Sequence, residues 1–127
     1  MNPREQEDAE FDKLADGKLR QIDRALAGFD PDEVECYLGG DILNLTLSSG
    51  SKVVINRHRA ARQIWMAAQR RAWHFDYDAA TSSWRTKDDE LVCALERVLS
   101  ESLKRPIKLK LAQVVLFIEE LADLVGA

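Results

Sequence analysis

The sequence predicts an α+β fold, a two-layer sandwich in which a five- to six-stranded antiparallel sheet carries two helices packed on one face, plus an extra C-terminal helix. Apolar residues recur at helical spacing near the start of the chain and again after residue 90. Between these two stretches lie short runs in which apolar and polar residues alternate, separated by turn residues. Short runs joined by tight turns are typical of an antiparallel meander. The 127 residues suit one domain with one core.

The first helix is expected from about Asp8 to Gly28. Its apolar residues are spaced by three and four, and the aliphatic part of Lys18 can lie along the same stripe. We expect the helix to end at Gly28 because Pro31 follows shortly after.

Strands are expected next, at residues 34–38, 42–47, 52–56, 63–67 and 73–78, with a short one around Trp84 and Arg85. The basic segment from Arg57 to Arg62 is expected to be a turn. Side chains alternate between the two faces of a strand, so Trp65 should face away from the buried Ile64 and Met66. A tryptophan on an uncovered sheet face leaves a large apolar surface in water, which indicates a binding role.

The second helix is expected to open at Asp88–Glu90, where acidic residues complement the helix dipole, and its apolar positions run from Leu91 to Leu103. We assign residues 1–105 to the main domain and residues 106–127 to an extension packed on it. The extension begins with a strand-like run from Ile107 to Leu111, and a helix is expected over residues 112–125. A monomer stabilised by this extension is expected, and a dimer formed through it is the alternative.

The charge is unevenly distributed, although the net charge is only −4. Residues 1–41 contain twelve acidic and five basic residues, whereas residues 52–71 contain six basic residues and no acidic one. This predicts one acidic and one basic face. Cys36 and Cys93 match no zinc or disulfide pattern and are expected to be reduced and largely buried. The polar, acidic first residues resemble no targeting signal and no stretch is apolar enough to span a bilayer, so a cytoplasmic protein is expected.

Carboxylates gather on one side of the first helix and continue beyond it. At about 100° per residue the first of them point in similar directions. We call this set the acidic ridge, and it comprises Asp12, Asp16, Asp23, Asp30, Asp32, Glu33 and Glu35. Exposed carboxylates can bind hard cations weakly. A solvated acidic face and a face that docks a basic partner fit the same spacing.

Arginines surround the tryptophans in the middle of the chain, at Arg57, Arg59, Arg62, Arg70 and Arg71. Aromatic and cationic side chains together are typical of nucleic-acid surfaces. However, the chain is acidic overall and has no RRM signature, so a protein-binding surface anchored by Trp65 is favoured. His58 and His74 are expected to be solvent-exposed in a turn and on a strand. No nucleophile motif or phosphate-binding loop is present, so no enzyme is expected.

About residues 9–103 resemble the frataxin family, whose bacterial members are CyaY-like proteins. The segments that carry the resemblance are Glu10–Asp16, Glu35–Cys36, Ile42–Leu47, Gly50–Asn56, Gln63–Ala67, His74–Asp76, Trp84 and Leu91–Leu99. The run Gly50–Asn56 followed by Gln63–Ala67 is the most specific part.

The resemblance implies an iron-binding regulator or iron chaperone of iron–sulfur cluster assembly. The acidic ridge would bind Fe²⁺ or Fe³⁺ weakly and dock the cysteine desulfurase. The open sheet face would bind the scaffold protein through Asn56, Gln63 and Trp65. Arg70 and Arg71 depart from the family pattern, and together with Arg62 they are expected to add positive charge to this partner-binding surface. The alternative is a protein-interaction module without a physiological metal role, and nucleic-acid binding is a weaker alternative. Ferroxidase activity is not assumed.

Overall fold

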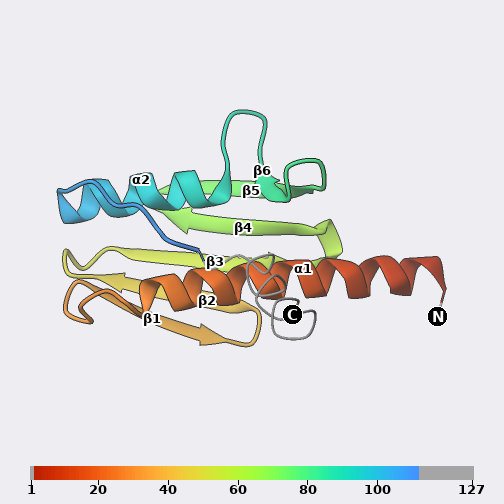
Figure 1. Ribbon diagram of the computed structural model, residues 1–127, viewed down its shortest axis with the longest axis horizontal. Coiled ribbons are helices and arrows are strands. Elements are labelled where there is room, and N and C mark those ends of the chain that lie inside the picture. The colour runs from red at the N-terminus through yellow and green to blue at the C-terminus, as the bar shows by residue number, and fades with distance from the viewer. Residues whose placement is uncertain (1, 112–127) are drawn as a thin grey trace, which may run out of the picture.

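The computed structural model describes residues 2–111 and contains two helices and a six-stranded sheet. The helices are α1 (Pro3–Leu26) and α2 (Leu91–Leu103), and a short 3-10 helix, η1, covers Arg59–Ala61. The strands are β1 (Val34–Gly39), β2 (Ile42–Leu47), β3 (Lys52–His58), β4 (Gln63–Ala68), β5 (Arg71–Asp78) and β6 (Ser83–Arg85). Every strand pairs antiparallel with the next one along the chain. Both helices lie along the strands over one face (Figure 1), so the predicted α+β sandwich is confirmed.

Helix α1 begins five residues earlier than the sequence pattern predicts. The side chain of Asn2 accepts a hydrogen bond from the Glu5 amide at 2.8 Å, and the Glu5 carboxylate accepts one from the Asn2 amide at 3.4 Å. Pro3 occupies the first helical position, where a missing N–H costs nothing. The first two turns thus depend on a capping box, whereas burial begins at Phe11, which is why apolar spacing misplaced the start.

The sheet buries one set of alternating side chains beneath the helices. Ile64 and Met66 of β4 are fully buried, and so is Trp84 of β6, which meets the ring of Phe11 edge-on at 5.8 Å. The opposite face carries no helix within the described part of the chain, and Trp65 lies on it as predicted. Lys18 of α1 is half-buried between the layers, where burial lowers the pKa of its ammonium group and nearby Glu90 opposes that change.

The basic segment after β3 is more ordered than a simple turn. Strand β3 continues to His58, and η1 follows. The Ala61 amide donates a hydrogen bond to Nδ1 of His58 at 3.3 Å, which caps η1. Arg62 then adopts a left-handed conformation with φ of 53°, which turns the chain into β4.

Residues 106–111 pair with no strand, so the strand-like run predicted from Ile107 to Leu111 does not join the sheet. They instead run back beside α2 as an extended segment (Figure 1). The amide of Ile107 donates to Oγ of Ser100 at 2.9 Å, and that of Leu109 donates to Oε2 of Glu96 at 2.7 Å. The Ile107 side chain joins the core. The helix expected over residues 112–125 lies outside the described residues, and no helix among residues 2–111 is both long and apolar enough to cross a membrane.

Removing the contacts of this segment is expected to destabilise the domain. The side chain of Ile107 is 6% exposed, so Ile107→Ala should lower the free energy of unfolding by about 2–4 kcal/mol through lost burial and a residual cavity. Urea unfolding measures the change, and Lys110→Ala, at an exposed position of the same segment, is the matched control.

A chain ending at Lys104 should melt at a lower temperature than the full chain while keeping the same monomer mass by light scattering. A halved mass would instead support the dimer. An unchanged mass together with an unchanged melting temperature would contradict both roles of the extension.

Candidate functional site

Trp65 stands between two histidines on the open face of the sheet. Its ring centroid lies 3.8 Å from that of His58 and 4.2 Å from that of His74, with interplanar angles of 13° and 11°. His74 is its direct cross-strand neighbour on β5, and His58 comes from the end of β3. We call these three side chains the His–Trp–His stack. The stack covers both faces of the indole, so Trp65 is only partly exposed.

Hydrogen bonds fix the orientation of the indole. Nε1 of Trp65 donates to Oε1 of Gln63 at 2.8 Å, and Nε2 of Gln63 donates to Oδ1 of Asp76 at 3.0 Å. Because an amide has one acceptor and one donor end, these two bonds together determine how Gln63 is turned. Asn56 pairs directly with Trp65 across β3 and β4. The structure therefore brings Asn56, Gln63 and Trp65 together, as the sequence predicted.

The prediction is confirmed for His74, which is exposed on β5, and is wrong for His58, which ends β3 and is only partly exposed. The sequence did not predict that both rings pack on Trp65. The pairing of His74 depends on the β4–β5 register, and the position of His58 depends on β3 running two residues further than expected. Alternation within a single strand carries no information about either, so sequence reasoning missed them.

Three arginines, one from β3, one from η1 and one from the residue between η1 and β4, turn towards α1. Each reaches carboxylates of the helix, and the contacts are Arg57 with Asp16 at 2.9 Å and Asp12 at 3.5 Å, Arg59 with Asp12 at 2.6 Å, and Arg62 with Glu7 at 2.5 Å and Asp8 at 3.1 Å. We call these side chains the arginine cluster. Hydrogen bonds to Asp12 and to Glu7 raise the pKa values of Arg59 and Arg62, respectively.

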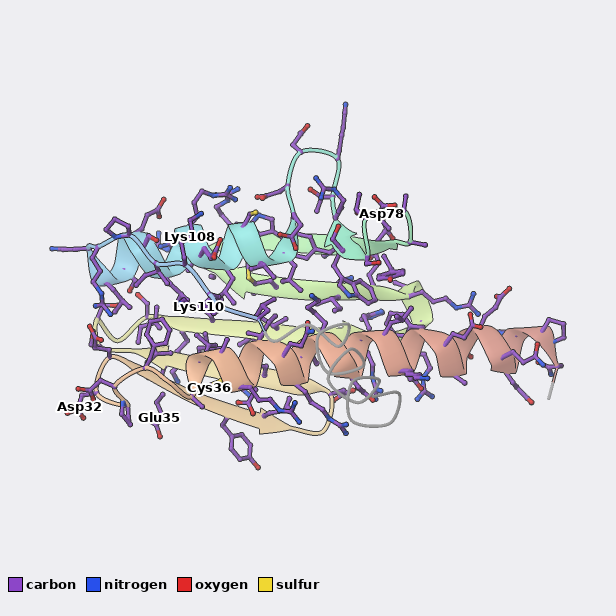
Figure 2. All side chains as sticks on the ribbon, viewed as in Figure 1. Asp32, Glu35, Cys36, Asp78, Lys108 and Lys110 are labelled. Carbon is purple, nitrogen blue, oxygen red and sulfur yellow. The ribbon has the colours of Figure 1, made fainter. Side chains whose placement is uncertain are left out.

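The arginine cluster neutralises the first part of the acidic ridge, since Asp12 and Asp16 are both paired. Further along, Asp23 accepts a hydrogen bond from Sγ of Cys36 at 3.3 Å, and Glu33 pairs with Arg105. The remaining carboxylates lie near the start of β1, where Figure 2 labels Asp32 and Glu35 projecting from the molecule. The Asp32 amide donates to Oδ1 of Asp30 at 2.9 Å.

The acidic ridge is thus an open row. Among residues 2–111, no group of three or more histidine, cysteine, aspartate or glutamate side chains is arranged to enclose a metal ion. Separate exposed carboxylates can still attract hard cations weakly.

Two of the arginines predicted near Trp65 lie elsewhere. Arg62 reaches α1, and the Arg71 guanidinium lies 4.5 Å from the ring centroid of Trp73. Arg71 and Trp73 are two residues apart on β5 and so share the helix-covered face, opposite the His–Trp–His stack. Arg70 is exposed in the turn before β5, with φ of 62°. The guanidinium groups of Arg62 and Arg71 therefore do not add positive charge beside Trp65, contrary to prediction.

The surroundings of both cysteines disfavour the thiolate. Burial, with a smaller effect from Asp23, raises the pKa of the half-buried Cys36 thiol to about 12. Cys93 is exposed on α2, contrary to prediction, and a hydrogen bond with Glu90 raises the pKa of its thiol. A raised pKa lowers the thiolate fraction at neutral pH, and the thiolate is the nucleophilic form.

The family model of the frataxin-like domain matches residues 4–108. The chain belongs to the frataxin family. It is 38% identical over 107 residues to the iron–sulfur cluster assembly protein CyaY of Dechloromonas aromatica (strain RCB), covering 82% of this chain and 99% of that relative. Among solved structures it resembles the frataxin from Psychromonas ingrahamii, with a TM-score of 0.70 and 25% identity over 80% of this chain and 95% of the other. The frataxin-like match includes Ile107, so it extends slightly past the boundary predicted at residue 105.

The members of the arginine cluster are expected to differ in their effect on stability. The Arg57 side chain is 18% exposed, so Arg57→Ala removes a partly buried ion pair with Asp16 and should cost about 1–3 kcal/mol, although Asp12 keeps its bond from Arg59. Arg59 is 56% exposed, so Arg59→Ala should change stability little, because water and salt screen its pair. Urea unfolding of both variants tests this, and equal losses would contradict the distinction.

Proposed function

We propose that the chain acts in iron–sulfur cluster assembly as an iron-binding regulator or iron chaperone in the cytoplasm. Membership of the frataxin family and the similarity to the iron–sulfur cluster assembly protein CyaY support the pathway. The observation that carries the proposal is the ordered Trp65 on an uncovered sheet face, beside Asn56 and Gln63. In this proposal the open face docks the iron–sulfur scaffold protein.

The His–Trp–His stack supports this role energetically. A large aromatic side chain that is already ordered loses little rotamer freedom when a partner binds. Tryptophan is also enriched among residues that dominate interface energies. Because two rings and Gln63 hold Trp65 in place, it is suited to act as an anchor.

In the same proposal the acidic ridge binds iron as cargo and docks a basic surface of the cysteine desulfurase. Iron should favour the carboxylates that no arginine occupies, namely Asp23, Asp30, Asp32 and Glu35. Binding should be weak, because hard cations are held tightly only when several oxygens converge. Asp12 and Asp16 should bind iron less well, since a cation must first displace Arg57 or Arg59. No enzymatic activity is proposed.

The second candidate is a protein-interaction module in which iron binding has no physiological role. The arginine cluster favours this candidate, because it neutralises part of the ridge within the molecule. The same contacts weaken the nucleic-acid alternative, since Arg57, Arg59 and Arg62 are engaged by carboxylates.

Iron titration should separate the two candidates. On anaerobic addition of Fe²⁺, amide signals of Asp23 and of residues 30–35 should change before those of Asp12 and Asp16. In Arg59→Ala the response should extend to Asp12, which loses its closest partner and keeps only the longer contact with Arg57 at 3.5 Å. Lys52→Ala removes the same charge from a strand end and is the control.

If the Fe²⁺ response of Asp12 increased equally in Arg59→Ala and Lys52→Ala, the increase would come from the change in net charge alone. If no amide signal of the acidic ridge changed at millimolar iron, the iron-binding proposal would be wrong and the protein-interaction module would be the remaining candidate.

Truncation of the anchor should weaken scaffold binding. Trp65→Ala is expected to reduce the affinity for the cognate scaffold protein at least about tenfold, because a central aromatic anchor contributes disproportionately to binding. Its affinity for the desulfurase should stay unchanged, since the acidic ridge is not altered. Calorimetry with each partner measures this, and wild-type affinity of the variant for the scaffold would show that Trp65 is not an anchor.

A further inference from the structure

Two adjacent rows of side chains cross the open face of the sheet without a charged residue. One row consists of Tyr37, Asn44, Val54, Ala67 and Ala72. The next consists of Gly39, Ile42, Asn56, Trp65 and His74. We call these ten residues, which span β1 to β5, the neutral band. None of them is buried.

The neutral band is bordered by charges on both sides. The row beyond Tyr37 contains Glu35 and Lys52, and the row beyond His74 contains Asp76 and Arg85. In a chain with 31% charged residues, ten exposed or partly exposed positions without charge need an explanation. Protein interfaces have this arrangement, with a charge-depleted centre and a polar rim.

Large apolar side chains are exposed at the β1–β2 end of the neutral band. Tyr37 is 69% exposed and Ile42 is 38% exposed. Among the described residues, only Leu14 of α1, at 40%, is a comparable exposed hydrophobic residue. Ile42 pairs directly with Asn56, which pairs with Trp65, so the apolar surface is continuous with the His–Trp–His stack.

The ring of Tyr37 rests on the backbone of Gly39, two residues further along the same face of β1. A Cβ atom added at Gly39 would lie only 2.7 Å from Cε1 of Tyr37. Glycine at this position therefore leaves the space that the ring occupies. The ring lies along the strand with its other side open to solvent, as a preorganised contact surface.

Tyr37 and Trp65 are close enough to serve one interface. They lie three strand spacings apart and two residues apart along the strands, or about 16 Å at the usual sheet dimensions. A typical interface covers roughly 800 Å² of each partner, or about 30 Å across. The twist of the sheet rotates β1 relative to β4, so the partner must follow a curved surface.

We propose that Tyr37 and Ile42 form a second anchor of the surface that docks the scaffold protein, so that the whole neutral band is the interface. This inference rests on the proposed function of Trp65. The partner should present apolar side chains to Tyr37, Ile42 and Val54, and amide or hydroxyl groups to Asn44 and Asn56. It should not rely on charge at the centre of the contact. A second copy of this chain is the competing occupant.

Truncation of the second anchor tests the proposal. Tyr37→Ser is expected to weaken binding of the cognate scaffold protein about tenfold by calorimetry, and Ile42→Thr, which preserves a β-branched residue, about threefold. Leu14→Ser removes a similarly exposed apolar side chain from α1, away from the neutral band, and should leave affinity unchanged. Thermal melts check that each variant is folded.

Gly39→Ala provides a second variant that keeps the tyrosine but displaces its ring. It should weaken binding about threefold in the wild-type background and have no further effect in Tyr37→Ser, because the ring that it displaces is then absent. If the losses of binding free energy in Gly39→Ala and Tyr37→Ser were additive, Gly39 would act through the strand itself. The proposal that Gly39 preorganises the ring of Tyr37 would then be wrong.

The outcomes separate this inference from the proposed function. If Trp65→Ala weakens scaffold binding and Tyr37→Ser does not, the second anchor is wrong and the proposed function stands. If neither variant weakens binding, both fail. A steep loss of affinity between about 50 and 500 mM salt would overturn the neutral chemistry of the contact. A dimer that Tyr37→Ser converts to a monomer would assign the neutral band to a second copy of the chain.

Discussion

Among residues 2–111 the helices cover only one face of the sheet, and the rest of this part of the structure depends on that constraint. The two helices bury one set of alternating side chains, and the same alternation places every second residue of each strand on the opposite face. Ile64 and Met66 become core residues, and Trp65 between them is consequently exposed to partners. Shifting β4 by one residue would bury the tryptophan and expose the core residues, so core packing and the binding surface are determined together.

The open face supports its tryptophan with its own side chains. Rings from β3 and β5 cover both sides of the indole, and Gln63 fixes its N–H. These contacts reduce the apolar area in water while leaving an ordered edge for recognition. Tyr37 on Gly39 repeats the same arrangement at the other end of the neutral band. An uncovered sheet face can thus remain ordered without a helix over it.

Charge is balanced within the molecule as well as exposed to partners. The acidic side of α1 faces β3 and η1, and the arginine cluster pairs with its carboxylates. Overall acidity therefore overstates the negative field near the N-terminal half of α1. The exposed acidic character concentrates towards the end of α1 and the start of β1, around Asp32 and Glu35. In this part of the ridge a cation or basic partner meets Asp32 and Glu35 without an arginine bound to them, whereas Glu33 is paired with Arg105.

Local patterns were sufficient for the element order, the sandwich and the outward position of Trp65, because periodicity reports which face of an element is buried. They were insufficient wherever two distant segments meet. The stacking of His58 and His74 on Trp65 could be seen only once the strand register was known. The pairing of Arg59 with Asp12 depends on how α1 docks on the sheet. The position of Arg71 on the helix-covered face depends on where β5 begins. The sequence by itself determined which face of each strand and of each helix the core buries. Only the tertiary structure decided which polar and aromatic side chains meet, because those contacts join segments whose separation along the chain carries no information about distance in space.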